Sequence, residues 1–155
     1  MNLGEALLEL KSMKSELSRL HEARKNSFRF PQGGKPEDGF DSVCVEIAAL
    51  SEKIRKLKVK VEATNQRHVI DTPEGKTSLA EAIHYIGDMR SELSALESLR
   101  EKFKNEDSYR WTKDETKYEC QISQKELLQK INELEKKKVR MDAFLSSWNW
   151  KVDVT

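Results

Sequence analysis

The sequence is poor in the residues that break helices and form turns. It contains six glycines and three prolines in 155 residues, about half the share found in typical soluble domains. Most of them lie in two short stretches, Pro31–Gly39 and Pro73–Gly75. A β-sandwich needs a turn about every 8–12 residues. The scarcity of turn residues therefore excludes that class and favours long uninterrupted elements.

Long apolar runs, a basic leader and paired cysteines are also missing. No stretch of about 18 apolar residues is present to form a transmembrane helix. The N-terminal segment Met1–Glu5 carries an acid where a secretory leader has basic residues. Cys44 and Cys120 lie far apart and form no CxxC motif. We therefore expect a cytoplasmic protein with two free thiols and no structural zinc site.

The charge is high but balanced. Lysine and arginine total 28, aspartate and glutamate total 27, and the net charge is +1. A nucleic-acid-binding protein usually has a clear basic excess, so no nucleic-acid partner is expected. Two basic runs nevertheless stand out, Lys53–Lys60 and Lys136–Arg140. Each is either a solvated helix face or a basic surface for an anionic partner.

Apolar residues recur at alternating steps of three and four through most of the chain. This period is typical of helices packed side by side as in a coiled coil. The four sets are Leu3, Leu7, Leu10, Met13, Leu17 and Leu20; Val43, Ile47, Leu50, Ile54, Leu57 and Val61; Leu79, Ala82, Ile86, Met89, Leu93, Leu96 and Phe103; and Leu127, Ile131, Leu134, Met141, Leu145 and Trp148. We therefore predict four long helices.

Helix starts agree with this period. Capping boxes are predicted where an Asn or Ser is followed three residues later by Glu, at Asn2–Glu5, Ser78–Glu81 and Ser123–Glu126. Lys138 interrupts the fourth apolar stripe. Its ammonium either reaches water, sets the register of the helices, or meets a ligand.

The sequence contains an internal repeat. Met13–Leu20 matches Met89–Leu96 at an offset of 76, and Ser27–Phe30 matches Ser108–Trp111. An offset of 84 aligns the second apolar set with the fourth and places Asn65 on Asn149. We therefore predict one domain, 1–155, in which residues 1–72 and 77–155 are two copies of a helical hairpin.

The expected fold is all-α. Two duplicated hairpins would pack as an antiparallel four-helix, coiled-coil-like bundle. Between the third and fourth helices, alternating residues favour a small β-hairpin or extended arm; they are Tyr109, Trp111, Tyr118, Cys120 and Ile122.

No catalytic motif is present. The three histidines form no HExxH, and GxSxG, Walker and GxGxxG patterns are absent. Glu81 and His84 have the Glu-x-x-His spacing of metal-binding bundles, but the other repeat has Glu5 and Leu8 there. We therefore predict no catalytic residue, no metal ligand and no cofactor.

The candidate functional residues are the aromatic arms and the repeated polar positions. Aromatic side chains flank an arginine in both copies, and an asparagine ends the second helix of each. These residues fit an oligomer contact, a membrane-touching tip or a ligand pocket. They are Phe28, Arg29, Phe30, Asn65, Tyr109, Arg110, Trp111 and Asn149.

Several short motifs resemble those of one bacterial family. They are Glu5-Ala6-Leu7, Asn26 with Arg29, Thr64-Asn65, Leu79-Ala80-Glu81-Ala82, Tyr109-Arg110 and Asn149-Trp150. These dispersed motifs span essentially the whole chain. In them the chain resembles the septicolysin-like proteins. That resemblance implies a small helical bacterial protein, and the family label implies a pore-forming cytolysin.

Three functions follow as alternatives. The first is a non-enzymatic, self-associating helical protein, favoured by the apolar stripes and the lack of catalytic motifs; its partner is a second copy of the chain. The second is a membrane-active, pore-forming toxin that contacts a membrane surface through aromatic residues. The third is a ligand-binding protein or enzyme that uses paired Arg, Asn and Glu positions, including Glu16 and Glu92.

Overall fold

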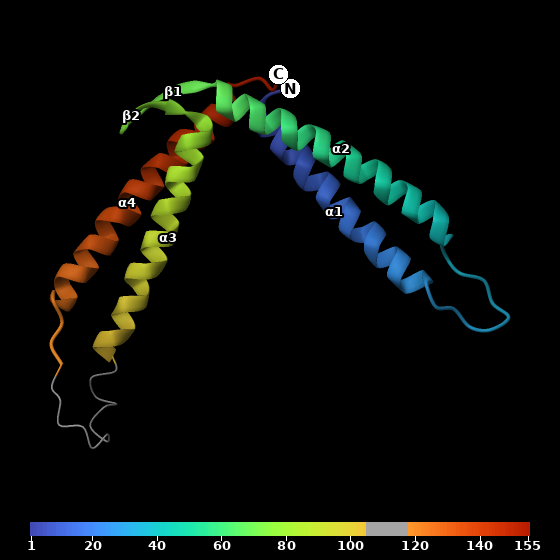
Figure 1. Cartoon of the computed structure of the whole chain (residues 1–155), viewed down its shortest axis with the longest axis horizontal. Helices are drawn as coiled ribbons and strands as arrows, with labels where there is room; N and C mark the ends of the chain where they lie inside the picture. The colour runs from blue at the N-terminus through green and yellow to red at the C-terminus, as the bar shows by residue number, and fades with distance from the viewer. Residues whose placement is uncertain (105–117) are drawn as a thin grey trace, which may run out of the picture. The chain divides into compact units, whose positions relative to one another are not determined.

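The computed structural model describes residues 1–104 and 118–155 (Figure 1). Four long helices and one two-stranded sheet follow in the order α1 (Leu3–Ser27), α2 (Phe40–Arg67), β1 (Val69–Thr72), β2 (Gly75–Ser78), α3 (Leu79–Lys104) and α4 (Gln124–Asn149). The four predicted helices and the largely helical class are confirmed.

The chain divides into two compact units. The first comprises Met1–His68 and Ser147–Thr155, and the second comprises Val69–Ser146. The single domain expected from the sequence stays a prediction, and each unit is described separately.

Capping boxes begin two helices as predicted. At α1, the Glu5 amide donates to Asn2 Oδ1 at 2.8 Å, and the Asn2 amide donates to the Glu5 carboxylate at 2.9 Å. Ser123 and Glu126 exchange the equivalent bonds before α4, at 3.1 and 2.7 Å. The bond from the Ser123 amide also holds the pKa of the Glu126 carboxyl below its ordinary value.

The predicted box at α3 is half formed. The Glu81 amide donates to Ser78 Oγ at 3.1 Å. The Glu81 carboxylate accepts a hydrogen bond from the Thr77 hydroxyl at 2.5 Å. Because Ser78 is the last residue of β2, the strand before the helix supplies this second donor.

In the first unit, α1 and α2 run antiparallel beside each other (Figure 1). Their facing sides bury the predicted apolar residues, together with Ala6: Leu3, Leu10, Val43, Ile47, Ile54 and Val61. The C-terminal tail then lies along the start of the chain. The Leu3 amide donates to the Val152 carbonyl at 2.8 Å, and the Val154 amide donates to the Met1 carbonyl at 2.9 Å.

The tail is also held by a buried threonine of α2. Thr64 is the one polar residue among the described buried side chains. Its hydroxyl donates to the Lys60 carbonyl at 2.9 Å and accepts from the Thr155 amide at 3.3 Å. Both hydrogen-bonding roles of the hydroxyl are thus used, which removes the cost of burying it.

The second unit begins with the β-hairpin. β1 and β2 are antiparallel, with Val69 opposite Ser78 and Thr72 opposite Gly75. The Thr72 hydroxyl accepts from the Glu74 amide at 3.1 Å and donates to the Gly75 carbonyl at 2.8 Å. Gly75 has φ of +123°, a conformation that side chains with a Cβ rarely adopt.

This hairpin corrects the predicted position of the β-structure. We expected a hairpin around Tyr109–Ile122, but the described part of that stretch, from Tyr118 onward, contains no strand; Tyr109 and Trp111 lie outside the described residues. The observed strands have more β-branched residues, and a Pro-Glu turn lies between them, directly before Gly75. Ile70 also gives β1 a buried anchor.

Burial of the apolar stripes is incomplete in both helical pairs. Fully buried residues alternate with positions of the same stripe that remain half-buried, because two helices side by side cover a narrower strip than these stripes occupy. The half-buried positions include Met13, Leu17, Leu20, Leu50, Leu57, Leu93, Leu96, Phe103 and Leu134.

Candidate functional site

The first aromatic arm lies at one end of the α1–α2 pair. The rings of Phe28 and Phe40 are tilted against each other with centroids 5.9 Å apart. Phe28, Phe30 and Phe40 are 67%, 51% and 50% exposed, and Arg29 is also exposed. These side chains therefore form an exposed aromatic tip, defined here as Phe28, Phe30 and Phe40.

Two of the predicted polar positions, Arg29 and Asn65, lie far apart. Asn65 lies near the C-terminal end of α2, and Arg29 follows α1 at the opposite end of the pair. At about 1.5 Å per residue, Asn65 is roughly 37 Å along the helix from Phe40. The structure therefore does not bring Arg29 and Asn65 together.

The other predicted residues differ in location and burial. Asn149 is the last residue of α4 and, like Asn65, is half-buried. Glu16 and Glu92 are exposed. Tyr109, Arg110 and Trp111 lie outside the described residues, so their proposed roles stay predictions.

A ring contact that the sequence did not predict lies at the end of α2. The His68 ring packs 5.7 Å from Trp148, and the Lys151 ammonium lies 5.3 Å from the Trp148 ring centroid. Trp148 continues the apolar stripe of α4, which is a sequence signal for packing. Nothing in the sequence pointed to His68 as its neighbour.

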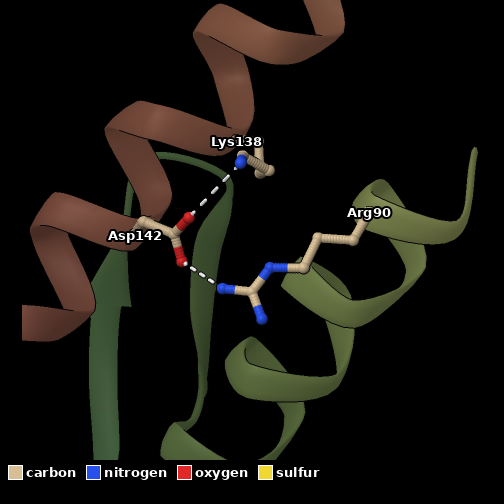
Figure 2. A network of polar contacts seen from close by, with 3 residues as sticks. All are labelled: Arg90, Lys138 and Asp142. Atoms are coloured by element: carbon tan, nitrogen blue, oxygen red, sulfur yellow. Dashed lines mark hydrogen bonds and ion pairs between the residues drawn. The ribbon is translucent and has the colours of Figure 1, made fainter. Parts of the chain in front are cut away.

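The cation that interrupts the fourth stripe is paired within its own unit. Lys138 Nζ lies 3.9 Å from Asp142 Oδ2, and Arg90 of α3 donates to Asp142 Oδ1 at 3.1 Å. Figure 2 shows Asp142 between the two cations. The Lys138 side chain is only 25% exposed. Asp142 therefore links α3 to α4, which supports the register interpretation of Lys138 over a ligand contact.

A groove of about 450 Å³ lies beside the β-hairpin. Its walls combine the turn, the first turns of α3 and one residue of α4; they include Glu74, Thr77, Glu81, His84, Tyr85, Asp88 and Met141. Lys137 crosses the edge of this region, 3.1 Å from the Glu74 carboxylate and 5.5 Å from the Tyr85 ring centroid. Contacts with Tyr85 and then Glu74 hold the pKa of Lys137 above its ordinary value.

Two carboxylates of this groove already have partners. Glu74 pairs with Lys137, and Glu81 accepts from Thr77 beside the helix start. Over residues 1–104 and 118–155, no group of three or more His, Cys, Asp or Glu residues is placed to hold a metal ion.

A second groove, also about 450 Å³, runs between α1 and α2. Its lining combines apolar and charged side chains: Leu17, Ser51, Ile54, Arg55, Lys58, Val59 and Glu62. Further along the same pair, Arg24 Nη1 approaches Cys44 Sγ at 3.5 Å, and Arg24 Nη2 lies 3.2 Å from His21 Nδ1. The basic run predicted at Lys53–Lys60 thus borders a groove lined in part by apolar side chains.

Residues 11–154 match a family model, which covers α2, α3 and α4 in full, α1 from residue 11 onward, and the lining of both grooves. The chain belongs to DUF6847, a family of unknown function. The DUF6847 match includes the Arg90–Asp142–Lys138 network and the β-hairpin.

A solved structure shares the DUF6847 chain's fold. It is the crystal structure of a functionally unknown conserved protein from Corynebacterium diphtheriae, with a TM-score of 0.85 and 19% sequence identity. The alignment covers 100% of this chain and 99% of that one. Among curated proteins, none matches the DUF6847 chain. These comparisons establish fold and family, and they leave activity to be inferred from the residues.

Proposed function

We propose that this protein is a non-enzymatic helical module that associates with further copies of itself. The observation that carries the proposal is the incomplete burial of its apolar stripes. Leu17 and Leu20 of α1 and Leu93 and Leu96 of α3 belong to the predicted seams yet remain half-buried. Apolar surface left in water costs free energy in proportion to its area, so covering these rows favours association.

The surface and charge of the chain support the same proposal. Large apolar side chains are exposed on every helix, including Leu7, Val59, Leu99 and Val139. The net charge is +1, so long-range repulsion between copies is weak. If two hairpins packed with their half-buried apolar rows facing each other, they would form a four-helix bundle. This is the arrangement that the sequence predicted.

Duplication is part of the proposal, because it would give both hairpins related surfaces. Helices α1 and α3 begin at Leu3 and Leu79, and α2 and α4 begin at Phe40 and Gln124. These starts differ by 76 and 84 residues, the offsets that align the repeated sequences. Agreement between helix starts and sequence offsets supports a common hairpin ancestor.

Leucine-to-glutamine variants in the half-buried rows test self-association. Leu20→Gln and Leu96→Gln change repeat-equivalent positions, and we expect each to weaken association about ten-fold or more, because a polar amide would be desolvated in the contact. Leu8→Gln, on an exposed outer position, is the control and should behave as wild type. Sedimentation velocity over about 1–300 μM measures the association constants. A wild-type protein that stays monomeric throughout this range contradicts the proposal.

A second candidate function is membrane contact through the aromatic tip. Phe28, Phe30 and Phe40 are each at least half exposed at one end of the α1–α2 pair, as in proteins that insert aromatic side chains into the membrane interface. Within the described part of the chain, no helix is long and apolar enough to cross a bilayer. A membrane role would therefore begin with surface contact by these rings.

Dye release from neutral and anionic vesicles distinguishes this second candidate. If it holds, leakage should rise with protein concentration, and replacing all three tip residues with serine should abolish it. The Leu8→Gln protein provides a control with a changed apolar residue elsewhere on the surface. Intact vesicles at every protein concentration, with folded protein present, would reject the membrane role and leave self-association as the proposal.

A further inference from the structure

One flank of the α1–α2 pair combines cationic and apolar side chains. Lys14, Leu17, His21 and Arg24 share a face of α1, because they are spaced three, four and three residues apart. The Arg24–Cys44 contact places that face beside α2. On α2, the groove continues with Arg55, Lys58 and Val59. We call this surface the basic flank: Lys14, Leu17, Arg24, Arg55, Lys58 and Val59.

The two cations at its centre form no close ion pair within the described part of the chain. Among the described residues, no carboxylate oxygen lies within 4.0 Å of Arg55 or Lys58, whereas the neighbouring Lys56 pairs with Glu52 at 2.6 Å. Val59, which lines the same groove, is 58% exposed. Glu62 is the single acid in the groove lining. The flank therefore presents positive charge next to apolar surface.

One face of α3 has the opposite character. Glu81, Asp88, Glu92 and Leu99 are separated by seven, four and seven residues, which places them along one side of the helix. Asp88 and Glu92 are exposed, and no described cation lies within 4.0 Å of either. Arg90 projects from another face and donates to Asp142. We call this surface the acidic face: Glu81, Asp88, Glu92 and Leu99.

We propose that the basic flank of one copy binds the acidic face of α3 in a second copy. This inference rests on the proposed self-association and adds a charged contact to the one that the half-buried apolar rows would make. Arg55 and Lys58 would meet Asp88 and Glu92, while Val59 and Leu99 contribute apolar contact. From Cys44 to Lys58 the flank is about 21 Å long, and the acidic face is about 27 Å long, so several turns can pair.

The composition of the flank favours a helix over a polyanion as the occupant. The apolar residues that line its groove are Leu17, Ile54 and Val59, and Glu62 would repel a phosphate backbone. A helix that carries both carboxylates and a leucine matches the cationic and the apolar residues together. In a two-fold dimer the contact forms twice, since each copy supplies one flank and one face.

Charge reversal in two matched variants tests this pairing. Variant A carries Arg55→Glu and Lys58→Glu, and variant B carries Asp88→Lys and Glu92→Lys. Like charges would then face each other between identical copies, and we expect each variant alone to associate about 10- to 100-fold more weakly than wild type. An equimolar mixture of A and B should recover association, because the reversed surfaces are again complementary.

A control changes charge on the same helix without touching the groove. Lys53 and Lys60 share another side of α2, so Lys53→Glu with Lys60→Glu should associate as wild type. Sedimentation velocity of each protein and of the mixture gives the masses. Circular dichroism confirms that each variant is folded, and recovery in the mixture shows independently that both surfaces survive.

The outcomes separate this inference from the proposal beneath it. A monomeric wild-type protein rejects both. A self-associating wild type with unchanged variants A and B rejects the pairing of these surfaces and leaves self-association intact. If variant A is weakened but the mixture does not recover, the basic flank contacts another surface of the second copy, and the assignment to α3 is wrong.

Discussion

Replacing Ile70 by alanine is expected to lower the free energy of unfolding by about 2–5 kcal/mol. Ile70 is 2% exposed and is the buried anchor of β1, the strand that contacts α3. Truncation would leave a cavity, and a two-stranded hairpin has little stability of its own to compensate for it. Urea unfolding followed by circular dichroism measures the effect.

The neighbouring residue provides the control. Val69 precedes Ile70 in the same strand, points to the opposite face and is 62% exposed. Val69→Ala should change stability by about 0.5 kcal/mol or less. Equal losses for the two variants would show that burial of Ile70 is not what anchors the hairpin.

The effect of Gly4→Ala on the free energy of unfolding is expected to change sign when Trp150 is replaced by alanine. A Cβ at Gly4 would lie 2.9 Å from atoms of the Trp150 ring, closer than van der Waals contact allows. In the wild-type background we expect a loss of about 1–3 kcal/mol from this overpacking. In a Trp150→Ala background the same substitution should stabilise by up to about 1 kcal/mol, because alanine favours the helix over glycine.

A double-mutant cycle by thermal or urea unfolding measures both steps. The four proteins are wild type, the two single variants and the double variant. The coupling between positions 4 and 150 should be large because their atoms touch. A stabilising Gly4→Ala in both backgrounds would mean that the Trp150 ring moves aside without cost.

The helices could be predicted because their determinants are local. The heptad period places the seam residues, and the Asn2–Glu5 and Ser123–Glu126 boxes fix where α1 and α4 begin. The β-hairpin was predicted in the wrong segment. The alternation that favoured Tyr118–Ile122 is short, and such a pattern is a weak signal for a strand. At Val69–Ser78 the decisive feature is burial of Ile70, which depends on tertiary contacts that sequence alternation does not contain.

The same difference between local sequence signals and tertiary contacts limited the prediction of the candidate site. The sequence identified Lys138 as an interruption in a stripe, and Asp142 lies one turn further on the same helix. Arg90, which completes their network, is 52 residues away from Asp142. The repeat likewise identified Arg29 and Asn65 as duplicated positions. Equivalence between copies says nothing about the distance between two positions in one copy, and these two lie at opposite ends of a helix pair.

Hydrogen bonds join Met1–Leu3 to Val152–Val154. The first unit can therefore form all of its contacts only after the second unit has been synthesised. The second unit, Val69–Ser146, is inserted between the two segments of the first. During synthesis all residues of the second unit leave the ribosome before the last nine residues of the first. The α1–α2 pair is therefore made earliest, yet its N-terminal end gains the segment that pairs with it only after the whole second unit has been synthesised.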